Sequence, residues 1–262
     1  ADYLQADETP IKVLDKDKKG TTHRGYHWVY HAPNERLVLF DYRQGRGREG
    51  PNEILKDFKG YLQADGYAVY EDFDNKPGIT LLNCMAHARR KFDEAKDNDL
   101  AKAEYALTEI QKIYAIERNA KTDGLSVAQR YQLRQEKSVP ALHDLKRWML
   151  ENYKSVLPKS TIGQALHYSL ERFDKLMRYT SDGKLEIDNN LVENAIRPVA
   201  IGRKNYLFAG SHNGAKRAAM LYSFLGTCKI NEVNPFDWLR ATLERIPTRP
   251  VNKLTDLLPC KV

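Results

Sequence analysis

The sequence has few cysteines and no long apolar segment. Only three cysteines occur in 262 residues (Cys84, Cys228 and Cys260), too few and too scattered for a disulfide framework or a four-ligand zinc site. No apolar run approaches the roughly 20 residues that span a membrane, and the polar start at Ala1 does not resemble a signal peptide. We therefore expect a protein of the reducing cytoplasm that is not inserted in a membrane.

Glycine and proline are also scarce, with 15 and 11 residues, which excludes a collagen-like repeat. Hydrophobic residues make up 42% of the chain and charged residues 29%, so wholesale disorder is excluded as well. The length suits one large domain or a domain with a sizeable insertion. Because the chain has no initiator methionine and starts directly in strand-like sequence, we expect a fragment or a processed product.

Apolar and β-branched runs predict a mixed α/β core in residues 1–86. Five strands are expected at Tyr3–Leu14, Tyr26–Tyr30, Arg36–Tyr42, Tyr61–Ala64 and Ile79–Asn83. A helix over Asn52–Lys59 and a short helical stretch near Tyr70 separate the last three strands. Three strands, helix, strand, helix, strand is the order of a ribonuclease H-like core.

From residue 87 to about residue 180 the apolar period changes to 3.6, which predicts a large all-helical insertion. Three amphipathic helices are marked within it, near Leu100–Tyr114, Leu142–Tyr153 and Leu166–Leu176, and breaks are expected at Pro140 and Pro158, among other places. Residues 181–231 complete the core with a short helix stopped by Pro198. Residues 232–262 form a helical C-terminal element, capped at its start by Asn234.

The pentapeptide Tyr-Leu-Gln-Ala-Asp occurs twice, ending at Asp7 and at Asp65. Each copy is predicted to be a strand whose aspartate comes at a turn. If the two strands are parallel neighbours, both carboxylates emerge at one end of the sheet, where open α/β sheets place their sites. Taken singly, each aspartate is better explained as a turn residue.

A third carboxylate changes that balance. Glu193 lies on a predicted helix and faces away from the apolar side chains of Leu191, Val192, Ala195 and Ile196. The alternative is that Glu193 has a structural role, an ion pair with Arg197 that would stabilise the helix by about 0.2 to 0.5 kcal/mol. Two aspartates and one glutamate also provide the hard oxygen ligands that two Mg²⁺ ions about 4 Å apart require.

Five segments of the chain resemble the insertion sequence 66 family of bacterial transposases, whose active site is an Asp-Asp-Glu (DDE) triad. The segments are ADETP around Asp7, QADGY around Asp65, CMAHARRKF from Cys84, DNNLVENAIRPVAIGRKNYLFAGS from Asp188, and the tail from Ala218 to Ile246. The resemblance implies a DDE/retroviral-integrase-like fold of the ribonuclease H class with Asp7, Asp65 and Glu193 as the triad, which would bind two Mg²⁺ or Mn²⁺ ions.

The same resemblance implies the partners. These are transposon ends and target DNA in the bacterial cytoplasm, at the nucleoid, with a homo-oligomer assembled on the DNA. Family members usually carry an N-terminal helical and zinc-binding region that recognises the transposon ends. Because the sequence from Ala1 onwards does not contain that region, we expect this chain to bind DNA without selecting the ends.

Basic residues support a nucleic-acid partner independently of the family. The chain has a net charge of +7, and the stretch from Asn194 to Asn231 has no acidic residue. It carries Arg197, Arg203, Lys204, Lys216, Arg217 and Lys229. We predict that the first five contact phosphate, and that Arg89 and Arg90 near the start of a helix are further candidates. Tyr206, Phe208 and His212 are candidates to stack on unpaired bases or to join the core.

Two patterns are not assigned a ligand. His23, His27 and His31 are spaced by four residues, but their surroundings alternate as in a strand, where four residues span about 13 Å, too far for a shared metal. The glycine-rich segment with Arg43, Arg46 and Arg48 lacks the Lys-Ser/Thr of a nucleotide-binding loop.

Three other functions remain open. A metal-independent tyrosine recombinase is suggested by His87-Ala88-Arg89 and by the 15 tyrosines. In a non-catalytic DNA-binding module, the carboxylates would be structural. A plain ribonuclease H-type nuclease fits the fold, because fold does not determine the substrate, although the Glu193 block and the helical insertion argue against it.

We predict that DNA binding is sensitive to salt and poor in sequence discrimination. The logarithm of the affinity for duplex DNA should fall with the logarithm of the salt concentration, with a slope of roughly −0.9 per phosphate contact. Reversing the charges of Arg203 and Lys204 should flatten that slope. The measurement is a salt titration with a fluorescent transposon-end duplex and a scrambled duplex. A strong preference for the transposon end would contradict the prediction.

Overall fold

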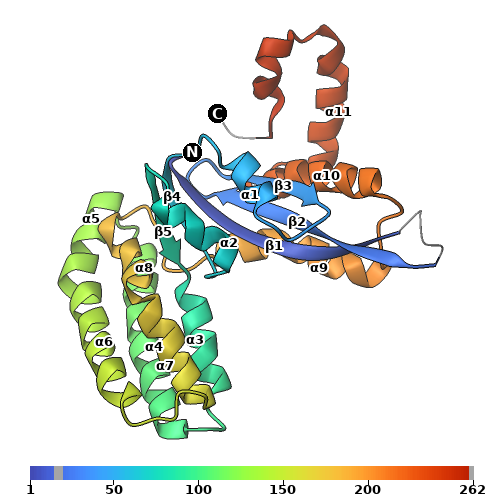
Figure 1. Cartoon of the computed structure of the whole chain (residues 1–262). Helices are drawn as coiled ribbons and strands as arrows, with labels where there is room; N and C mark the ends of the chain where they lie inside the picture. The colour runs from blue at the N-terminus through green and yellow to red at the C-terminus, as the bar shows by residue number, and fades with distance from the viewer. Residues whose placement is uncertain (15–19, 260–262) are drawn as a thin grey trace. The chain divides into compact units, whose positions relative to one another are not determined.

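The computed structural model describes residues 1–14 and 20–259, which form a mixed α/β structure with a five-stranded mixed sheet (Figure 1). The hydrogen-bonded strand order is β3-β2-β1-β4-β5, and both β1–β2 and β2–β3 are antiparallel. The strands are β1 (Tyr3–Leu14), β2 (Thr22–Ala32), β3 (Leu37–Arg43), β4 (Gly60–Ala64) and β5 (Ile79–Asn83). All five predicted strands are confirmed, the second being longer than predicted. Cys260 and residues 261–262 lie outside the described residues.

Helices make up the remaining elements, and every element between β5 and residue 181 is helical, as predicted. In chain order they are α1 (Glu49–Ile54), α2 (Ala68–Glu71), η1 (Asp72–Asn75), α3 (Met85–Glu94), α4 (Leu100–Thr122), α5 (Val127–Leu133), the π-helix η2 (Arg134–Ser138), α6 (Val139–Tyr153), α7 (Thr161–Glu171), α8 (Phe173–Met177), η3 (Arg178–Ser181), α9 (Asn190–Tyr206), α10 (His212–Ile230), α11 (Pro235–Arg245), η4 (Ile246–Thr248) and η5 (Val251–Leu257). Within the described part of the chain, no helix has the length and hydropathy needed to cross a membrane.

The chain divides into two compact units. Unit 1 comprises Ala1–Leu62, Lys76–Ile79 and Asn190–Val262, and unit 2 comprises Gln63–Asn75 and Thr80–Asn189. The predicted division at residues 86, 180 and 231 stays a prediction.

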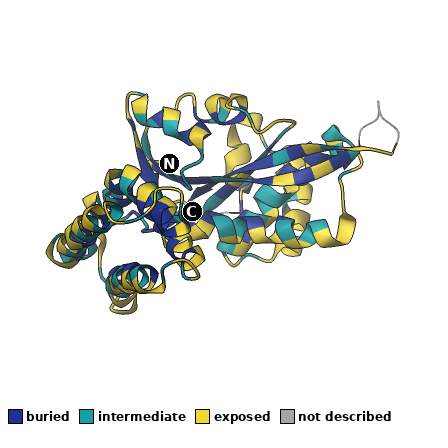
Figure 2. Cartoon of the chain, turned by 60° about the horizontal axis from the view of Figure 1, so that its bottom comes forward, coloured by how far each residue is buried: buried dark blue, intermediate teal, exposed yellow. Residues whose placement is uncertain are grey.

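The core of unit 1 lies between the sheet and two helices. Strand β2 is mostly buried, β1 and β3 alternate between buried and more exposed residues, and helices α9 and α10 carry both buried and exposed residues (Figure 2). The buried cluster comprises Ile11, Val13, Val29, Val38, Phe40, Tyr42, Val192, Ile196, Val199, Ala215 and Ala219. Helix α10 also covers the outer edge of β3, where the Phe40 amide donates to Ser223 Oγ at 2.8 Å and the Val38 amide donates to Thr227 Oγ1 at 3.3 Å. These hydroxyls satisfy the backbone of an edge strand.

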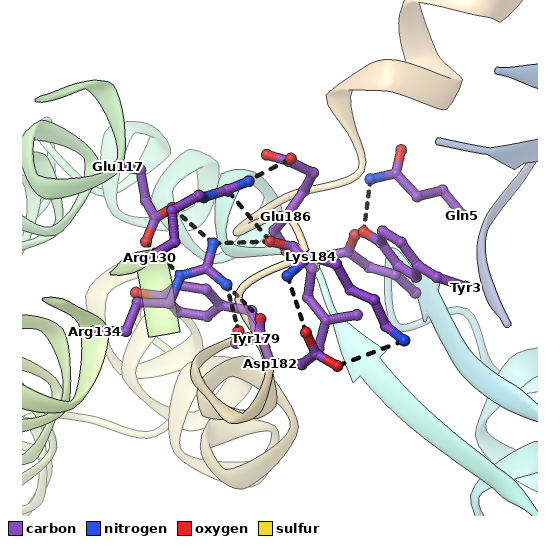
Figure 3. A network of polar contacts seen from close by, with 11 residues as sticks. Tyr3, Gln5, Glu117, Arg130, Arg134, Tyr179, Asp182, Lys184 and Glu186 are labelled. Atoms are coloured by element: carbon purple, nitrogen blue, oxygen red, sulfur yellow. Dashed lines mark hydrogen bonds and ion pairs between the residues drawn. The ribbon is translucent and has the colours of Figure 1, made fainter. Parts of the chain in front are cut away.

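Unit 2 contains a buried guanidinium, that of Arg134, at the centre of a network of polar contacts (Figure 3). Arg134 donates to both carboxylate oxygens of Glu117, at 2.9 and 2.7 Å. It also donates to the carbonyls of Tyr179, Asp182 and Leu185, at 2.9, 2.6 and 2.8 Å. A buried charge is tolerated only when it is paired and fully hydrogen-bonded, and all five N–H groups of Arg134 have an acceptor here. The network ties helices α4 and η2 to the segment that follows η3.

Pro198 does not stop its helix, contrary to the sequence prediction. Helix α9 continues to Tyr206 with Pro198 inside it. Proline removes one i to i−4 hydrogen bond, here to the Asn194 carbonyl, and its ring crowds that carbonyl. Pro198 is exposed, while Val192, Ile196 and Val199 are buried against the sheet. The packing of these three side chains therefore outweighs the local cost of the proline.

Pro140 likewise does not break the helical path. The chain stays helical from Val127 to Tyr153, and Pro140 lies in the first turn of α6. The turn before it is π-helical. Since Pro140 has no amide hydrogen for the carbonyl of residue 136, the hydrogen-bond ladder rearranges there instead of ending.

Two predicted helix boundaries were wrong. The helix expected over Asn52–Lys59 is α1, which starts three residues earlier and ends at Ile54. Leu55 is its C-cap, with φ −98° and ψ 13°, and the chain turns after it, with the Phe58 amide donating to the Leu55 carbonyl at 3.2 Å. The helix expected over Leu166–Leu176 is divided at Arg172 into α7 and α8.

The histidines of β2 lie on a strand, as predicted. His27 and His31 are buried, 1% and 4% exposed. Burial lowers the pKa of His27 to about 4, with a smaller contribution from the positive charge of Arg203, and burial lowers the pKa of His31 to about 4. Both rings are therefore neutral in the folded protein at neutral pH.

We expect the free energy of unfolding to fall as the pH is lowered from about 6.5 to about 4. In that window the unfolded chain takes up protons on His27 and His31 that the folded chain does not accept, and above it neither state is protonated. Each histidine adds a slope of at most about 1.4 kcal/mol per pH unit. Urea denaturation over this pH range should show a smaller slope for His27→Gln combined with His31→Gln than for the exposed control His143→Gln. Equal slopes would contradict the prediction.

Candidate functional site

Asp7 lies within strand β1, in unit 1. It is half-buried and stands opposite Val29 of β2, and its Oδ1 accepts the amide of Glu8 at 2.8 Å. The expectation that Asp7 sits at a turn is wrong, because β2 pairs with β1 continuously from Gln5 to Leu14. Asp7 therefore projects from a continuous strand, whose backbone fixes its direction.

Asp65 directly follows the last residue of β4 and lies in unit 2, which agrees with the predicted turn. It is half-buried, and its Oδ1 accepts the amide of Tyr67 at 2.9 Å. This bond, two residues ahead of the aspartate, is an Asx-turn. Gly66 follows with a φ of +91°, a conformation that favours glycine.

Glu193 lies in the first turn of α9, in unit 1, and is half-buried. The helix packs on β1 and β2 through Val192, Ile196 and Val199, which contact a cluster that includes Ile11, Val13 and Val29. Alternate residues of a strand share one face, so Asp7 points to the same face of the sheet as Ile11 and Val13. Asp7 and Glu193 thus belong to the same side of unit 1.

Two buried glutamines, one from each copy of the pentapeptide, hold the chain on either side of the start of α9. Gln5, 0% exposed, accepts the Val192 amide on Oε1 at 3.2 Å and donates to the Tyr3 hydroxyl at 3.0 Å. Gln63, also 0% exposed, donates to the Glu186 carbonyl at 2.9 Å. The sequence predictions did not include these glutamines, although their equal position in the repeat was visible.

Residues 186–189, which lead from the partner of Gln63 to the start of α9, form two further hydrogen bonds within unit 2. The Tyr114 hydroxyl donates to Asp188 Oδ2 at 2.8 Å, and the Asn189 amide donates to Cys84 Sγ at 3.4 Å. Burial raises the pKa of the Cys84 thiol to about 12, so Cys84 is a protonated packing residue and not a nucleophile.

The three predicted triad residues are divided between the units, with Asp7 and Glu193 in unit 1 and Asp65 in unit 2. Among residues 1–14 and 20–259, no group of three or more His, Cys, Asp and Glu side chains is placed to bind a metal ion. The donor set itself suits magnesium or manganese, because carboxylate oxygens are the ligands these ions prefer. The shared metal site remains a prediction.

The predicted phosphate-binding residues are mostly exposed. Arg197, Lys204, Lys216 and Arg217 in unit 1, and Arg89 and Arg90 on α3 in unit 2, are exposed and make no ion pair with the rest of the described chain. Arg203 is half-buried and donates to the Pro10 carbonyl, so this cation also has a structural role.

The aromatic residues predicted near this basic surface have different environments. Tyr206 and Phe208 are each 40% exposed, whereas His212 is half-buried, with its Nδ1 and the Tyr42 hydroxyl 2.7 Å apart. His212 therefore belongs to the packing of β3 and α10. Tyr206 and Phe208 retain exposed ring surface.

The arginine-rich loop after β3 is largely neutralised by acidic residues. Arg43 pairs with Asp41 at 2.5 Å and with Glu53 at 2.7 Å, and Arg46 pairs with Glu8. Arg43 and Arg46 therefore have structural partners close by, which accounts for arginines in this segment without a bound ligand.

Comparison with known proteins gives consistent matches along the chain. Residues 1–217 match the transposase IS66 family, and residues 223–260 match the IS66 C-terminal element. The uncharacterized protein y4qI of Sinorhizobium fredii (strain NBRC 101917 / NGR234) is 36% identical over 274 residues, which cover 97% of this chain and 50% of that protein. The uncharacterized protein y4hP of the same organism is 32% identical over 283 residues, 99% of this chain and 50% of that protein.

A shorter relative matches part of the chain. The uncharacterized protein YuaK of Escherichia coli (strain K12) is 34% identical over 101 residues, 38% of this chain and 90% of that protein. The chain spans about half the length of y4qI and y4hP. No solved structure matches the chain.

We expect the two buried glutamines to stabilise the fold. Gln5→Leu leaves the Val192 amide without its acceptor, and Gln63→Leu leaves the Glu186 carbonyl without its donor. Each change should lower the free energy of unfolding by about 1 to 3 kcal/mol, the usual cost of an unsatisfied buried polar group. Urea denaturation measures this, with Gln111→Leu at an exposed position of α4 as the control. Stability equal to that of the control would show that water replaces the lost partner.

Proposed function

The chain belongs to the IS66 family of transposases, and from this membership we propose that it is the catalytic part of a DDE transposase. It would cleave a phosphodiester at a transposon end and join the freed 3′-hydroxyl to target DNA. Because the chain spans about half the length of y4qI and y4hP, the activity of the whole protein is part of this proposal.

We infer a ribonuclease H-like fold for the core. The order of elements supports this inference, since three antiparallel strands are followed by two further strands with helices between them. The sheet order also supports it, because β1 is central, with β2 on one side and β4 on the other.

Asp7, Asp65 and Glu193 are the proposed ligands of two Mg²⁺ or Mn²⁺ ions. Bound divalent ions supply Lewis-acid stabilisation of phosphate charge and lower the pKa of water. The residues of the chain orient the reacting groups. Asp7 is directed by the strand backbone, Asp65 by its bond to the Tyr67 amide, and Glu193 by the packing of α9.

The observation that carries the proposal is the hydrogen bond between Gln5 and the Val192 amide. It joins the residue two positions before Asp7 to the residue one position before Glu193. Two carboxylates from distant parts of the sequence thereby come to the same side of unit 1.

Exposed cations supply the proposed DNA contact. Arg197 and Lys204 lie on α9, the helix that carries Glu193, and Lys216 and Arg217 lie on the adjacent α10. We propose that they neutralise phosphates, which gives affinity without base recognition. A homo-oligomer on DNA is part of the same proposal, because each of two transposon ends needs an active site.

We expect DNA cleavage and joining to require a divalent metal and all three carboxylates. Asp7→Asn, Asp65→Asn and Glu193→Gln should each lower the rate at least about 100-fold, because each removes a charged ligand. The assay is product formation from a labelled duplex carrying the end of the element that encodes the chain, with Mg²⁺, Mn²⁺ or EDTA. Glu104→Gln, an exposed residue of α4, is the matched control.

The same assay separates the other candidate functions. Full activity in EDTA would contradict the proposal and favour a tyrosine recombinase. DNA binding without cleavage in any metal would favour a non-catalytic module. Cleavage of DNA without joining would favour a plain nuclease.

A further inference from the structure

In unit 2, two cations beyond α7 pair with acidic residues of the segment that follows Asp65. Lys175 of α8 pairs with Glu71, and Arg178 of η3 pairs with Asp74. Both charges are neutralised by this segment. They attach the end of the helical insertion to it and are not left for a DNA phosphate.

Arg172, one turn before Lys175, has no such acidic partner. Its ion pair is with its neighbour Glu171, at 2.6 Å, and that carboxylate is 57% exposed. An exposed pair of this kind contributes little free energy and is readily exchanged. In addition, the buried Arg172 Nε has no hydrogen-bond partner among the described residues. The terminal Nη groups, whose acceptor among the described residues is the exposed Glu171 carboxylate, are the donors available to another anion.

Arg172 lies directly beside the turn that carries Asp65. A Cβ atom at Gly66 would lie 2.8 Å from Arg172 Nε and 3.1 Å from the Tyr168 hydroxyl. The Arg172 guanidinium stacks on the Tyr168 ring, with 4.4 Å between its carbon and the ring centroid. The Tyr168 hydroxyl donates to the Asp65 carbonyl at 2.7 Å. One tyrosine of the insertion thus holds both the arginine and the backbone of the aspartate.

We propose that Arg172 binds a phosphate of the DNA substrate next to Asp65, and that Tyr168 is the positioning residue that holds Arg172 there. The helical insertion then has a defined role, which is to supply a phosphate contact at the Asp65 part of the site. This inference rests on the proposed function, because it takes Asp65 as a residue of the active site.

Geometry and chemistry favour a phosphate over a structural role for Arg172. A planar guanidinium presents paired donors that match two phosphate oxygens, and stacking on an aromatic ring fixes its plane without using those donors. A purely structural arginine would be expected to satisfy its donors as Arg134 does, with five protein acceptors. Arg172 also does not pair with Asp65, which leaves that carboxylate its charge for a metal ion.

The test compares Arg172→Gln with Arg118→Gln, a loss of the same charge at an exposed position of α4. The readouts are the melting temperature, the salt dependence of duplex DNA binding, and the cleavage rate in Mg²⁺. We expect Arg172→Gln to melt like the control and to flatten the salt slope by about 0.9, the loss of one phosphate contact. It should also lower the cleavage rate about 10- to 100-fold. Tyr168→Phe should lower the rate less and leave the salt slope nearly unchanged.

The proposal is overturned if Arg172→Gln has the salt slope and the rate of Arg118→Gln. If Arg172→Gln does not fold, Arg172→Met keeps the side-chain packing on Tyr168 and is judged by the same two readouts. The Asp65→Asn variant separates this inference from the proposed function. Cleavage that depends on Asp65 but not on Arg172 would contradict only the inference about Arg172. A wild-type chain without metal-dependent cleavage would contradict the proposed function. The binding readout needs no turnover and decides on Arg172 in either case.

Discussion

The hydrogen bonds of Gln5 and Gln63 are the interactions on which the placement of the candidate site depends. The chain leaves the sheet after β5, passes through eight helical elements and has to return to the correct place before α9 begins. Gln63 holds the Glu186 carbonyl in unit 2, and Gln5 holds the Val192 amide in unit 1. Because both side-chain amides are fully buried, loss of either hydrogen bond would leave a buried polar group without that partner, at a cost of about 1 to 3 kcal/mol.

The distribution of basic residues follows the same physical logic. Arg134 is buried, and all five of its N–H groups donate to protein acceptors. Lys175 and Arg178 form ion pairs with acidic residues of α2 and η1. The predicted phosphate-binding cations other than the half-buried Arg203 are instead exposed, and they form no ion pair among residues 1–14 and 20–259. For the proposed DNA contact, positive charge is useful only where it is not already paired with an acidic side chain. The net charge of +7 therefore does not show which cations are available to a phosphate.

Most of the secondary structure could be predicted because periodicity is a local property. Alternation identified all five strands, and the 3.6-residue period identified the helical insertion. The errors occurred where tertiary packing overrides a local signal. Pro198 lies inside α9 because Val192, Ile196 and Val199 are buried against the sheet, and Pro140 lies in a helical path that becomes π-helical before it. Asp7 is in mid-strand because β2 pairs along the full length of β1, a partner that the local sequence of β1 does not reveal.

The sequence by itself determined the family and most of the element types, and it is the source of the proposed triad, because motifs and periodicities depend on neighbouring residues. Only the tertiary structure decided which charges are consumed by ion pairs, that Gln5 and Gln63 hold the chain around α9, and that Tyr168 and Arg172 lie beside Asp65. The contacts of Gln5 with Val192, of Gln63 with Glu186 and of Tyr168 with Asp65 join residues that are about a hundred or more positions apart in the chain. No local pattern encodes such pairs, since they form only when burial removes water and each polar group must find a protein partner.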